Sequence, residues 1–468
     1  MDASETTAEK QDHEALNQAA GCLRRALGAP GQGSDSARFE LYLERRSRPK
    51  VDARNQKIDT FSRSEDSGLS IRVLKHQKMG FSFTTSLAPE AIEKAARAAC
   101  EMAEHMPQDS FQELTSFQVE RFSDPTALRI RDTDGPSRST ETKIAMALEL
   151  EDLCRQADPR IRAVRSALIS ETLLSQKLMD HDGRVLESHS TTYAASLSCK
   201  AEQSGDNRMG GESLYTPFLS ELSLKPVAQN AAQNATELLG ASLPPTLTCP
   251  AVLRSDVMAD LLGFLSASFS AEQVDKGQSM LSLTQLGKKL LSSCITLVDD
   301  GLLPGGVGSS PFDGEGTASG TTTLVHEGSL KQLLCDRYHS KKLGLPATGN
   351  AGRGIKSPPS ISTSNLYLKP GHQTPLELMN GIQKGVMITD LMGVHTANSV
   401  TGDFSLGASG FLIENGRISR PISGFAVAGN ILDVFQSVQA LANDLKFYGS
   451  TGSPSVLIPR LSVGGSSS

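Results

Sequence analysis

Four carboxylates lie around one glycine-rich segment of this 468-residue sequence and are the first candidates for chemistry. They are Asp299, Asp300, Asp313 and Glu315, and the segment is Gly305-Gly306-Val307-Gly308. Carboxylates at this spacing can supply oxygen ligands for a cation, or a general acid and base. They can equally form turns, because Asp accepts backbone N–H bonds and glycine tolerates a positive φ. We favour turns, and keep a hydrolase site near Asp313 and Glu315 as the alternative.

The segment His326-Glu327-Gly328-Ser329-Leu330 begins like the zinc-binding motif HExxH but ends without its second histidine. HExxH binds zinc because two histidines four residues apart lie on one face of a helix. Leu330 takes the place of the second histidine, and Gly328-Ser329 favours a turn. The other histidines have no His or Cys neighbour at ligand spacing. We therefore expect a strand end here, and no metal ligands in this chain.

Other nucleophile and phosphate motifs are missing from the sequence. There is no GxSxG elbow, no GxxxxGK[ST] loop and no cysteine-protease signature. Gly305 to Gly308 lacks the Lys-Ser/Thr ending of a phosphate loop, so we expect a loop without a cofactor.

Composition excludes several classes of protein. Lys and Arg number 46 against 52 Asp and Glu, which gives a net charge of −6. Direct nucleic-acid binding needs a basic surface, so we expect none. The seven cysteines are single and odd in number, which is typical of reduced thiols. The polar start has no signal-like apolar run, and no apolar stretch reaches the about 18 residues of a membrane helix. We expect a cytoplasmic protein that does not enter a membrane.

The elements that must position these residues begin with a small α/β unit over residues 1–120. Apolar spacing predicts a helix from Leu16 to Leu27, and alternation predicts strands at 39–43, 69–73 and 79–83. A second amphipathic helix should run from Pro89 to Met106.

Residues 121–245 form a second expected unit, which is α+β. Helices are predicted at 144–154 and 227–239, with strand-like runs at 164–174, 177–179 and 193–199 between them. The segment from Gly240 to Pro245 has the composition of a linker.

Residues 246–468 should form a larger and mainly antiparallel β domain. Its clearest signal is a hairpin over 411–418, whose Asn415-Gly416 pair suits a turn with positive φ. The fold class predicted for the chain is α+β.

Several blocks read in order resemble the TldD/PmbA family, long labelled modulators of DNA gyrase. The resemblance is diffuse before residue 240 and strong from about residue 250. The blocks are Phe312-Asp313-Gly314-Glu315-Gly316-Thr317, Ala347-Thr348-Gly349-Asn350-Ala351, Asn398 to Ser405, Gly410 to Gly416, Ala428-Gly429-Asn430, Asn443-Asp444-Leu445 and Ser453 to Ile458. They match the PmbA branch, also called TldE.

The resemblance implies a two-subunit metalloprotease. TldD-like subunits carry zinc on a HExxxH helix with a distant cysteine, and PmbA-like subunits lack it. By the block Lys276-Gly277-Gln278-Ser279, the zinc helix should fall near Leu261 to Ala267, which has neither His nor Glu. Near the C-terminus, Phe447 to Ser453 has no Cys. Without these groups zinc has no ligands and its water has no base.

We therefore expect a zinc-free PmbA/TldE-like subunit that joins a TldD-like zinc subunit as a heterodimer, or forms a homodimer in its absence. It would help to act on small or unfolded peptides, which the family processes in microcin maturation and antitoxin degradation. A non-enzymatic adaptor is a further alternative. No catalytic residue is assigned. The residues expected at a peptide cleft or loop are Phe312, Asp313, Glu315, Gly316 and Asn350.

Overall fold

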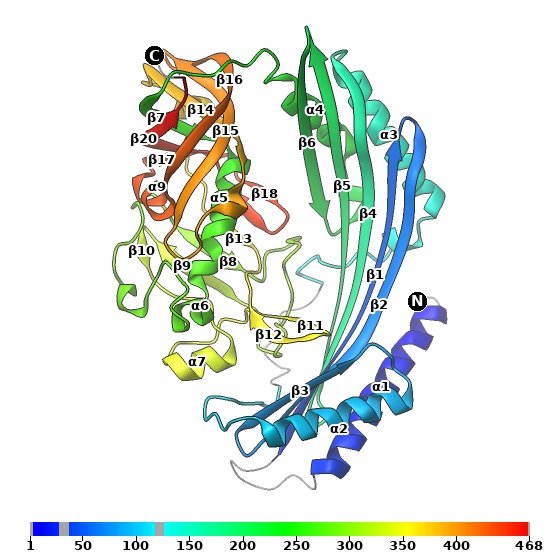
Figure 1. Cartoon of the computed structure of the whole chain (residues 1–468). Coiled ribbons are helices and arrows are strands. Elements are labelled where there is room, and N and C mark those ends of the chain that lie inside the picture. Colours follow the sequence, from blue (N-terminus) through cyan, green and yellow to red (C-terminus); the bar gives the residue numbers. More distant parts are fainter. Residues whose placement is uncertain (1–2, 28–36, 118–125, 467–468) are drawn as a thin grey trace.

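The structure is a computed structural model that describes residues 3–27, 37–117 and 126–466. Strands and helices are mixed, and the strands pair mostly antiparallel (Figure 1), which confirms the α+β class. A long curved sheet stands beside a separate C-terminal body of two further sheets.

The long sheet has the strand order β3-β2-β1-β4-β5-β6. Its strands are β1 (Arg38–Arg54), β2 (Lys57–Lys75), β3 (Lys78–Thr84), β4 (Ile161–Asp180), β5 (Val185–Gln203) and β6 (Asp206–Thr216). Pairing of β1 with β4 joins the two expected N-terminal units into one sheet. The two strand-like runs at 164–174 and 177–179 are parts of β4. The expected boundary at residue 120 lies outside the described residues and stays a prediction.

Two pairs of helices cover opposite ends of one face of this sheet. The first pair is α1 (Ala3–Leu27) and α2 (Pro89–His105), and the second is α3 (Thr140–Ala157) and α4 (Leu224–Thr236). Leu41 and Leu43 of β1 pack with the first pair, and Val51 packs with the second. Because side chains alternate along a strand, these odd-numbered residues share one face, and Tyr42 points to the other.

The C-terminal domain contains two six-stranded sheets and a hairpin. The first sheet is formed by β7 (Leu247–Leu253), β14 (Lys384–Met392), β15 (Asp403–Glu414), β16 (Arg417–Asn430), β17 (Ala440–Leu441) and β20 (Val456–Gly464). The second is formed by β8 (Leu297–Asp300), β9 (Thr321–His326), β10 (Ser329–Leu330), β13 (Leu366–Leu368), β18 (Lys446–Tyr448) and β19 (Thr451–Ser453). The hairpin is β11 (Ala351–Gly354) with β12 (Ser357–Ile361).

Helix α5 (Ser255–Ser266) packs between these two sheets and shares one apolar core with both. Leu261 and Leu265 of the helix meet Val386 of the first sheet and Leu324 of the second in this core. The shorter helices are α6 (Ala271–Asp275), α7 (Arg337–Leu343), α8 (Pro375–Leu378) and α9 (Ile431–Ser437).

Two local predictions of turns are confirmed. Asn415 and Gly416 have φ of 51° and 75° and join β15 to β16. His326 ends β9, and Glu327 and Gly328 form a turn with positive φ before β10. The HExxH-like segment is therefore a hairpin, as its Gly-Ser pair predicted.

The segment from Gly240 to Pro245 is not a free linker. The Ser242 N–H donates to the Pro421 carbonyl, and Ser466 N–H donates to the Pro244 carbonyl at 2.9 Å. The composition of this segment predicted a linker. Composition cannot show the backbone hydrogen-bond partners that the C-terminal domain supplies.

Within the described residues, none of the helices combines the length and the apolar character needed to cross a membrane.

We predict that Gly80→Ala destabilises the protein by about 1–3 kcal/mol. A Cβ at Gly80 of β3 would lie 2.0 Å from the Ala99 carbonyl oxygen of α2, so helix and strand would have to separate. Gly263→Ala in α5 is the matched control. It has no atom within 4 Å of the new Cβ and should stabilise by up to about 1 kcal/mol. Urea unfolding measures both, and equal shifts would contradict the packing argument.

Candidate functional site

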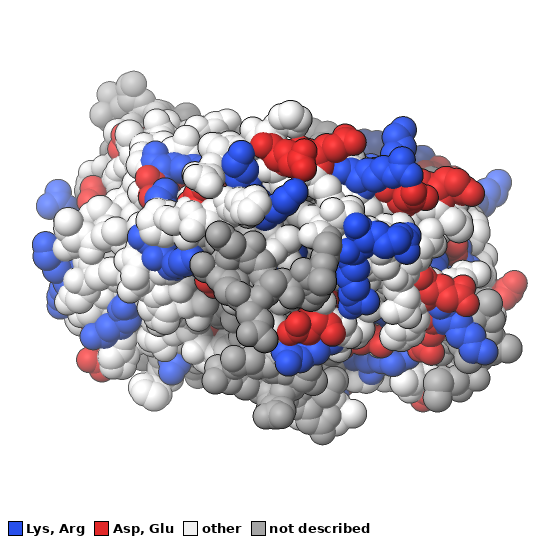
Figure 2. Space-filling model, turned by 90° about the horizontal axis from the view of Figure 1, so that it is seen from below, with Lys and Arg blue, Asp and Glu red and all other residues white. Residues whose placement is uncertain are grey.

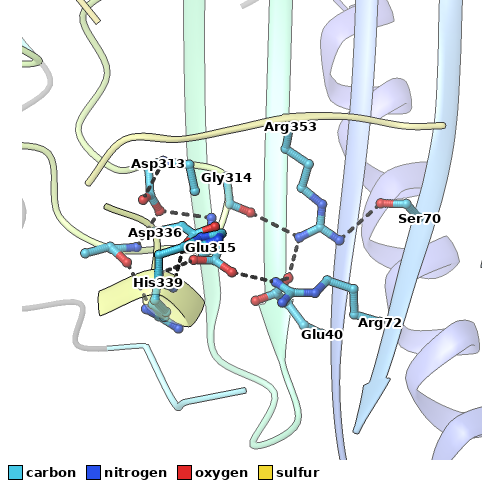
Figure 3. A network of polar contacts seen from close by, with 12 residues as sticks. Glu40, Ser70, Arg72, Asp313, Gly314, Glu315, Asp336, His339 and Arg353 are labelled. Atoms are coloured by element: carbon cyan, nitrogen blue, oxygen red, sulfur yellow. Dashed lines mark hydrogen bonds and ion pairs between the residues drawn. The ribbon is translucent and has the colours of Figure 1, made fainter. Parts of the chain in front are cut away.

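A buried group of four charges joins the long sheet to the C-terminal domain (Figure 3). We call Glu40, Arg72, Glu315 and Arg353 the four-charge cluster. Arg72 Nη1 lies 3.0 Å from Glu315 Oε1 and 3.4 Å from Glu40 Oε1. Arg353 forms the other ion pair with Glu40. Each side chain is at most 8% exposed, so the two carboxylates and two guanidinium groups satisfy one another away from water.

Strand register places the first half of the cluster. Glu40 of β1 lies directly opposite Arg72 of β2, and both point to the face that the first helix pair leaves free. Tyr42 and Ser70 form another directly opposed pair, two residues farther along the strands. They place an aromatic ring and a hydroxyl on the same face as Glu40 and Arg72.

The β11–β12 hairpin supplies Arg353, whose two terminal guanidinium nitrogens both have partners, whereas its buried Nε has none. It donates to the Gly314 carbonyl at 3.1 Å and to Ser70 Oγ at 3.1 Å, and it stacks 4.9 Å above the Tyr42 ring centroid. A Cβ on Gly68 of β2 would lie 2.7 Å from Ile355 Cγ2 at the tip of the hairpin. The hairpin can approach the sheet this closely because residue 68 is a glycine.

The cluster is built to stay ionised. Burial alone raises the pKa of Glu40, but the Arg353 and Arg72 charges outweigh it and hold the pKa of Glu40 below its usual value. Burial lowers the pKa of Arg353, and the Glu40 carboxylate opposes that change. A guanidinium with an ordinary pKa above 12 keeps its proton regardless. These groups therefore hold two parts of the chain together and do not exchange protons with a substrate.

Asp313 fixes a turn through three backbone donors. Its Oδ1 accepts the N–H groups of Glu315 and Thr317, each at 2.9 Å, and its Oδ2 accepts the Ala351 N–H at 3.0 Å. This is the turn interpretation of the sequence. Burial and the neighbouring Glu315 carboxylate raise the pKa of Asp313 to about 7, while the backbone donors oppose that rise.

Glu315 connects the cluster to helix α7. Its Oε2 accepts the Arg337 N–H at 2.9 Å at the start of that helix. Asp336 caps α7 by accepting the backbone N–H of His339 at 2.7 Å, and it also lies 2.8 Å from His339 Nδ1. The His339 side chain is buried beside Asp336, the capping residue of its own helix. His339 therefore has a structural role here.

The predicted loop residues Phe312, Gly316 and Asn350 also lie at this contact. Phe312 packs with Tyr42 and Phe117 in a small apolar cluster between the domains. Gly316 has φ of 71°, and a Cβ there would lie 2.5 Å from the Phe117 ring. Asn350 donates to Asp299 Oδ2 at 2.6 Å.

A polar cavity of about 220 Å³ opens beside these residues. Tyr42 and Gln176 of the long sheet line one side, and Phe312, Asp313 and Asn350 line the other. Phe312, Asp313 and Asn350 in this lining were predicted from the sequence. Glu40, Arg72 and Arg353 were not, because nothing local in a strand or hairpin sequence shows that a distant charge will face it.

The four acidic residues around Gly305–Gly308 do not converge. Asp299 accepts from Asn350 and from the Ser364 N–H, and Asp300 accepts from the Leu302 N–H and Thr321 Oγ1. Asp313 and Glu315 are occupied as described above. The geometry therefore favours turns over an acid and base pair.

Glu9, Glu187 and His189 form the one set of three potential metal ligands that the described residues bring within 4.8 Å of one another. The buried Lys177 ammonium lies 3.0 Å from Glu187 Oε1. The hydrogen bond from His189, followed by that from Lys177, lowers the pKa of Glu187 to about 2 despite burial. A resident ammonium charge opposes a metal ion, so this set is an ion-pair group.

The two segments at which zinc ligands were considered do pack together. Helix α5 contacts β18 and β19, and Ser255 Oγ lies 2.8 Å from the Tyr448 hydroxyl. Zinc prefers Cys, His and carboxylate ligands. The α5 carboxylate nearest this contact, Asp256, already pairs with Arg254 at 2.6 Å, and 447–453 contains no His or Cys. These residues do not fit a zinc ion.

Acidic and basic side chains are interspersed on the face of the molecule that Figure 2 shows from below. The described residues visible there form no broad field of one sign. The expected absence of nucleic-acid binding stays a prediction.

Sequence models of three PmbA/TldA metallopeptidase domains match the chain in order. Domain 1 matches residues 39–103, the central domain matches 133–239, and the C-terminal domain matches 246–465. The chain is similar to metalloprotease PmbA of Escherichia coli O157:H7, with 27% identity over 94% of each chain.

Solved structures share the fold. A Thermotoga maritima protein that carries the name of a DNA gyrase modulator superposes with a TM-score of 0.86 at 25% identity, covering 96% of this chain and 99% of the other. TldE from Thermococcus kodakarensis superposes with a TM-score of 0.84 at 19% identity, covering 96% and 100%.

We predict that Arg353→Met lowers the free energy of unfolding by about 3–5 kcal/mol, because it leaves the buried Glu40 with one fewer cation. Arg97→Met, on the exposed face of α2, is the matched control and should leave stability unchanged. Chemical denaturation compares the two. A loss from Arg353→Met no larger than from Arg97→Met would mean that the cluster does not hold the domains.

We predict that Asp313→Asn becomes more favourable relative to wild type as the pH rises. The folded-state pKa of Asp313 is raised to about 7, so its contribution is fully present below about pH 4 and is lost as the pH rises through 7. Asparagine cannot ionise, although it loses the Ala351 hydrogen bond at every pH. Unfolding free energies at pH 5 to 8 test this. A difference that stays constant over this range would show that the raised pKa is wrong.

Proposed function

The chain belongs to the PmbA/TldD metallopeptidase family, and from this membership we propose that it is the zinc-free subunit of a two-subunit peptidase. Its partner would be a TldD-like subunit that carries the catalytic zinc, and the substrates would be small or unfolded peptides in the cytoplasm. The old gyrase name would then reflect an indirect effect of processing a peptide that acts on gyrase.

The observation that carries the proposal is the packing of α5 against β18 and β19. The resemblance places the zinc helix of the related subunits in the first segment and their cysteine in the second. Here both segments meet through Ser255 and Tyr448, and neither has the histidines, glutamate and cysteine of a zinc site. A chain that keeps the architecture and lacks these ligands is suited to assembling with a subunit that has them.

The long sheet gives this subunit a means of holding peptides. Strands β3 and β6 are its two edges, and each has one side without a strand partner in the sheet. An extended peptide can add to such an edge through main-chain hydrogen bonds, which bind many sequences. The four-charge cluster fixes this sheet against the C-terminal domain, so an edge would be presented in a defined place.

We predict that the purified chain binds no stoichiometric zinc and cleaves no unfolded peptide, because the ligand set is missing. Mixed with a TldD-like homologue that bears HExxxH, it should co-purify and raise peptide hydrolysis strongly. Elemental analysis after dialysis, gel filtration and a casein-derived peptide assay measure these outcomes.

Three results would contradict the proposal. One zinc per chain, lost on mutating His326 or His339, would mean a metal site of its own. Turnover by the isolated chain that falls about a hundredfold in a folded Asp313→Asn variant would favour the independent hydrolase. Binding to the homologue with no change in its hydrolysis would favour the adaptor.

A further inference from the structure

A second cavity lies on the helix-covered face of the long sheet, between the two helix pairs. It has a volume of about 140 Å³ and is lined by β1, β2, β4, β5 and the segment that leads into α3. Ser47 and Val51 of β1 line it, and they share the odd-numbered face with Leu43. The cavity is therefore separate from the 220 Å³ cavity, which lies on the opposite face.

The lining of this cavity is cationic. Arg63, Arg138 and Lys143 contribute three positive charges, and Glu171 contributes the one negative charge. Lys50 also borders the cavity, but as an even-numbered residue of β1 it points to the opposite face of the sheet. Glu171 is occupied by Lys143, and Arg63 pairs with Glu65 at 2.8 Å. Within the described residues, Arg138 forms no ion pair. One cation is thus available at the mouth of a cavity whose acid is already neutralised.

Two hydroxyl groups at the cavity have no hydrogen-bond partner in the described residues. These are the Tyr193 hydroxyl and Ser47 Oγ, and both atoms are buried. Tyr193 is 1% exposed. Burial and the charges of Glu171 and Asp132 raise the pKa of Tyr193, so the hydroxyl keeps its proton and remains a donor. A buried donor without an acceptor costs free energy unless a ligand or water accepts from it.

The wall of the cavity is fixed before any ligand arrives. Asp132 Oδ1 accepts the N–H groups of Asp134 and Gly135, and its Oδ2 accepts the Leu219 N–H at 2.9 Å. The first turn of α3 is capped by Ser139, which accepts the Thr142 N–H. We therefore expect a ligand to be held by the side chains of the lining.

Apolar groups lie next to the cations. Val51 and Ile169 form the floor, and Phe61, which is 52% exposed, stands at the rim. A free inorganic anion has no apolar part that could pack against these side chains. A carboxylate attached to an aliphatic or aromatic residue matches both parts of the lining.

We propose that this cavity binds the C-terminal carboxylate and last side chain of a short peptide. Arg138 neutralises the carboxylate, and Tyr193 and Ser47 donate to its oxygens. Choosing a peptide as the ligand rests on the proposed function, whereas the preference for a carboxylate rests on the cavity alone. The subunit would thereby favour peptides with a free C-terminus.

Isothermal titration calorimetry on the isolated full chain tests this without any partner or catalysis. The probes are N-acetyl-Ala-Leu-Phe with a free carboxylate, the same peptide as its C-terminal amide, and inorganic phosphate. The free acid should bind at least about tenfold more tightly than the amide, because charge-assisted hydrogen bonds are lost in the amide. It should also bind more tightly than phosphate.

Variants separate the site from general charge. Arg138→Gln should weaken the free acid about tenfold or more, and Lys225→Gln on the exposed face of α4 should not. Tyr193→Phe should weaken it several-fold with an unchanged urea midpoint, because the hydroxyl has no internal partner.

Three results would overturn the proposal. The first is equal binding of acid and amide, including no binding of either. The second is an equal loss of affinity from Lys225→Gln and from Arg138→Gln. The third is phosphate binding at least as tightly as the peptide. None of these bears on zinc content or partner assembly, so the proposed function stands or falls separately.

Discussion

The guanidinium group of Arg72 lies between two carboxylates from distant parts of the chain, Glu40 of β1 and Glu315 of the C-terminal domain. Each of these charges is buried and would be costly without its neighbours. The cluster therefore tolerates one arrangement of sheet and domain, because any displacement leaves a charge unpaired. Asp313 and Phe312 take their places around this constraint, the first through backbone donors and the second through apolar packing.

The two faces of the long sheet therefore make different kinds of contact. Even-numbered residues of β1 carry the interdomain contact, and odd-numbered residues carry the helix cores and the cationic cavity between them. Farther along the sheet, Lys446 pairs with Glu212 at 2.6 Å, and Arg254 with Glu237 at 2.9 Å. The sheet is thus held at more than one point against the C-terminal domain, and its edges keep a fixed position relative to it.

This use of charged residues bears on function. Acids that looked available for catalysis, Asp313 and Glu315, are occupied by backbone donors and by Arg72. The histidine that is most buried, His339, contacts its own helix cap. Among the described residues, the buried polar atoms without a hydrogen-bond partner include the two hydroxyls beside the cationic cavity. This distribution of partners supports the proposed role of a subunit that binds peptides beside a zinc-bearing partner.

Features that depend on neighbouring residues along the chain could be predicted from the sequence. Period and turn chemistry predicted α2, the Asn415-Gly416 hairpin and the hairpin at His326, and the ordered blocks predicted the family. The glycines near Asp313 in the sequence predicted that this residue would form a turn. Only the tertiary structure decided that the two N-terminal units share one sheet, that Gly240 to Pro245 is hydrogen bonded, and that Glu40, Arg72 and Arg353 meet. The reason is physical: a buried charge is explained by its partner, and here the partners are up to 313 residues apart.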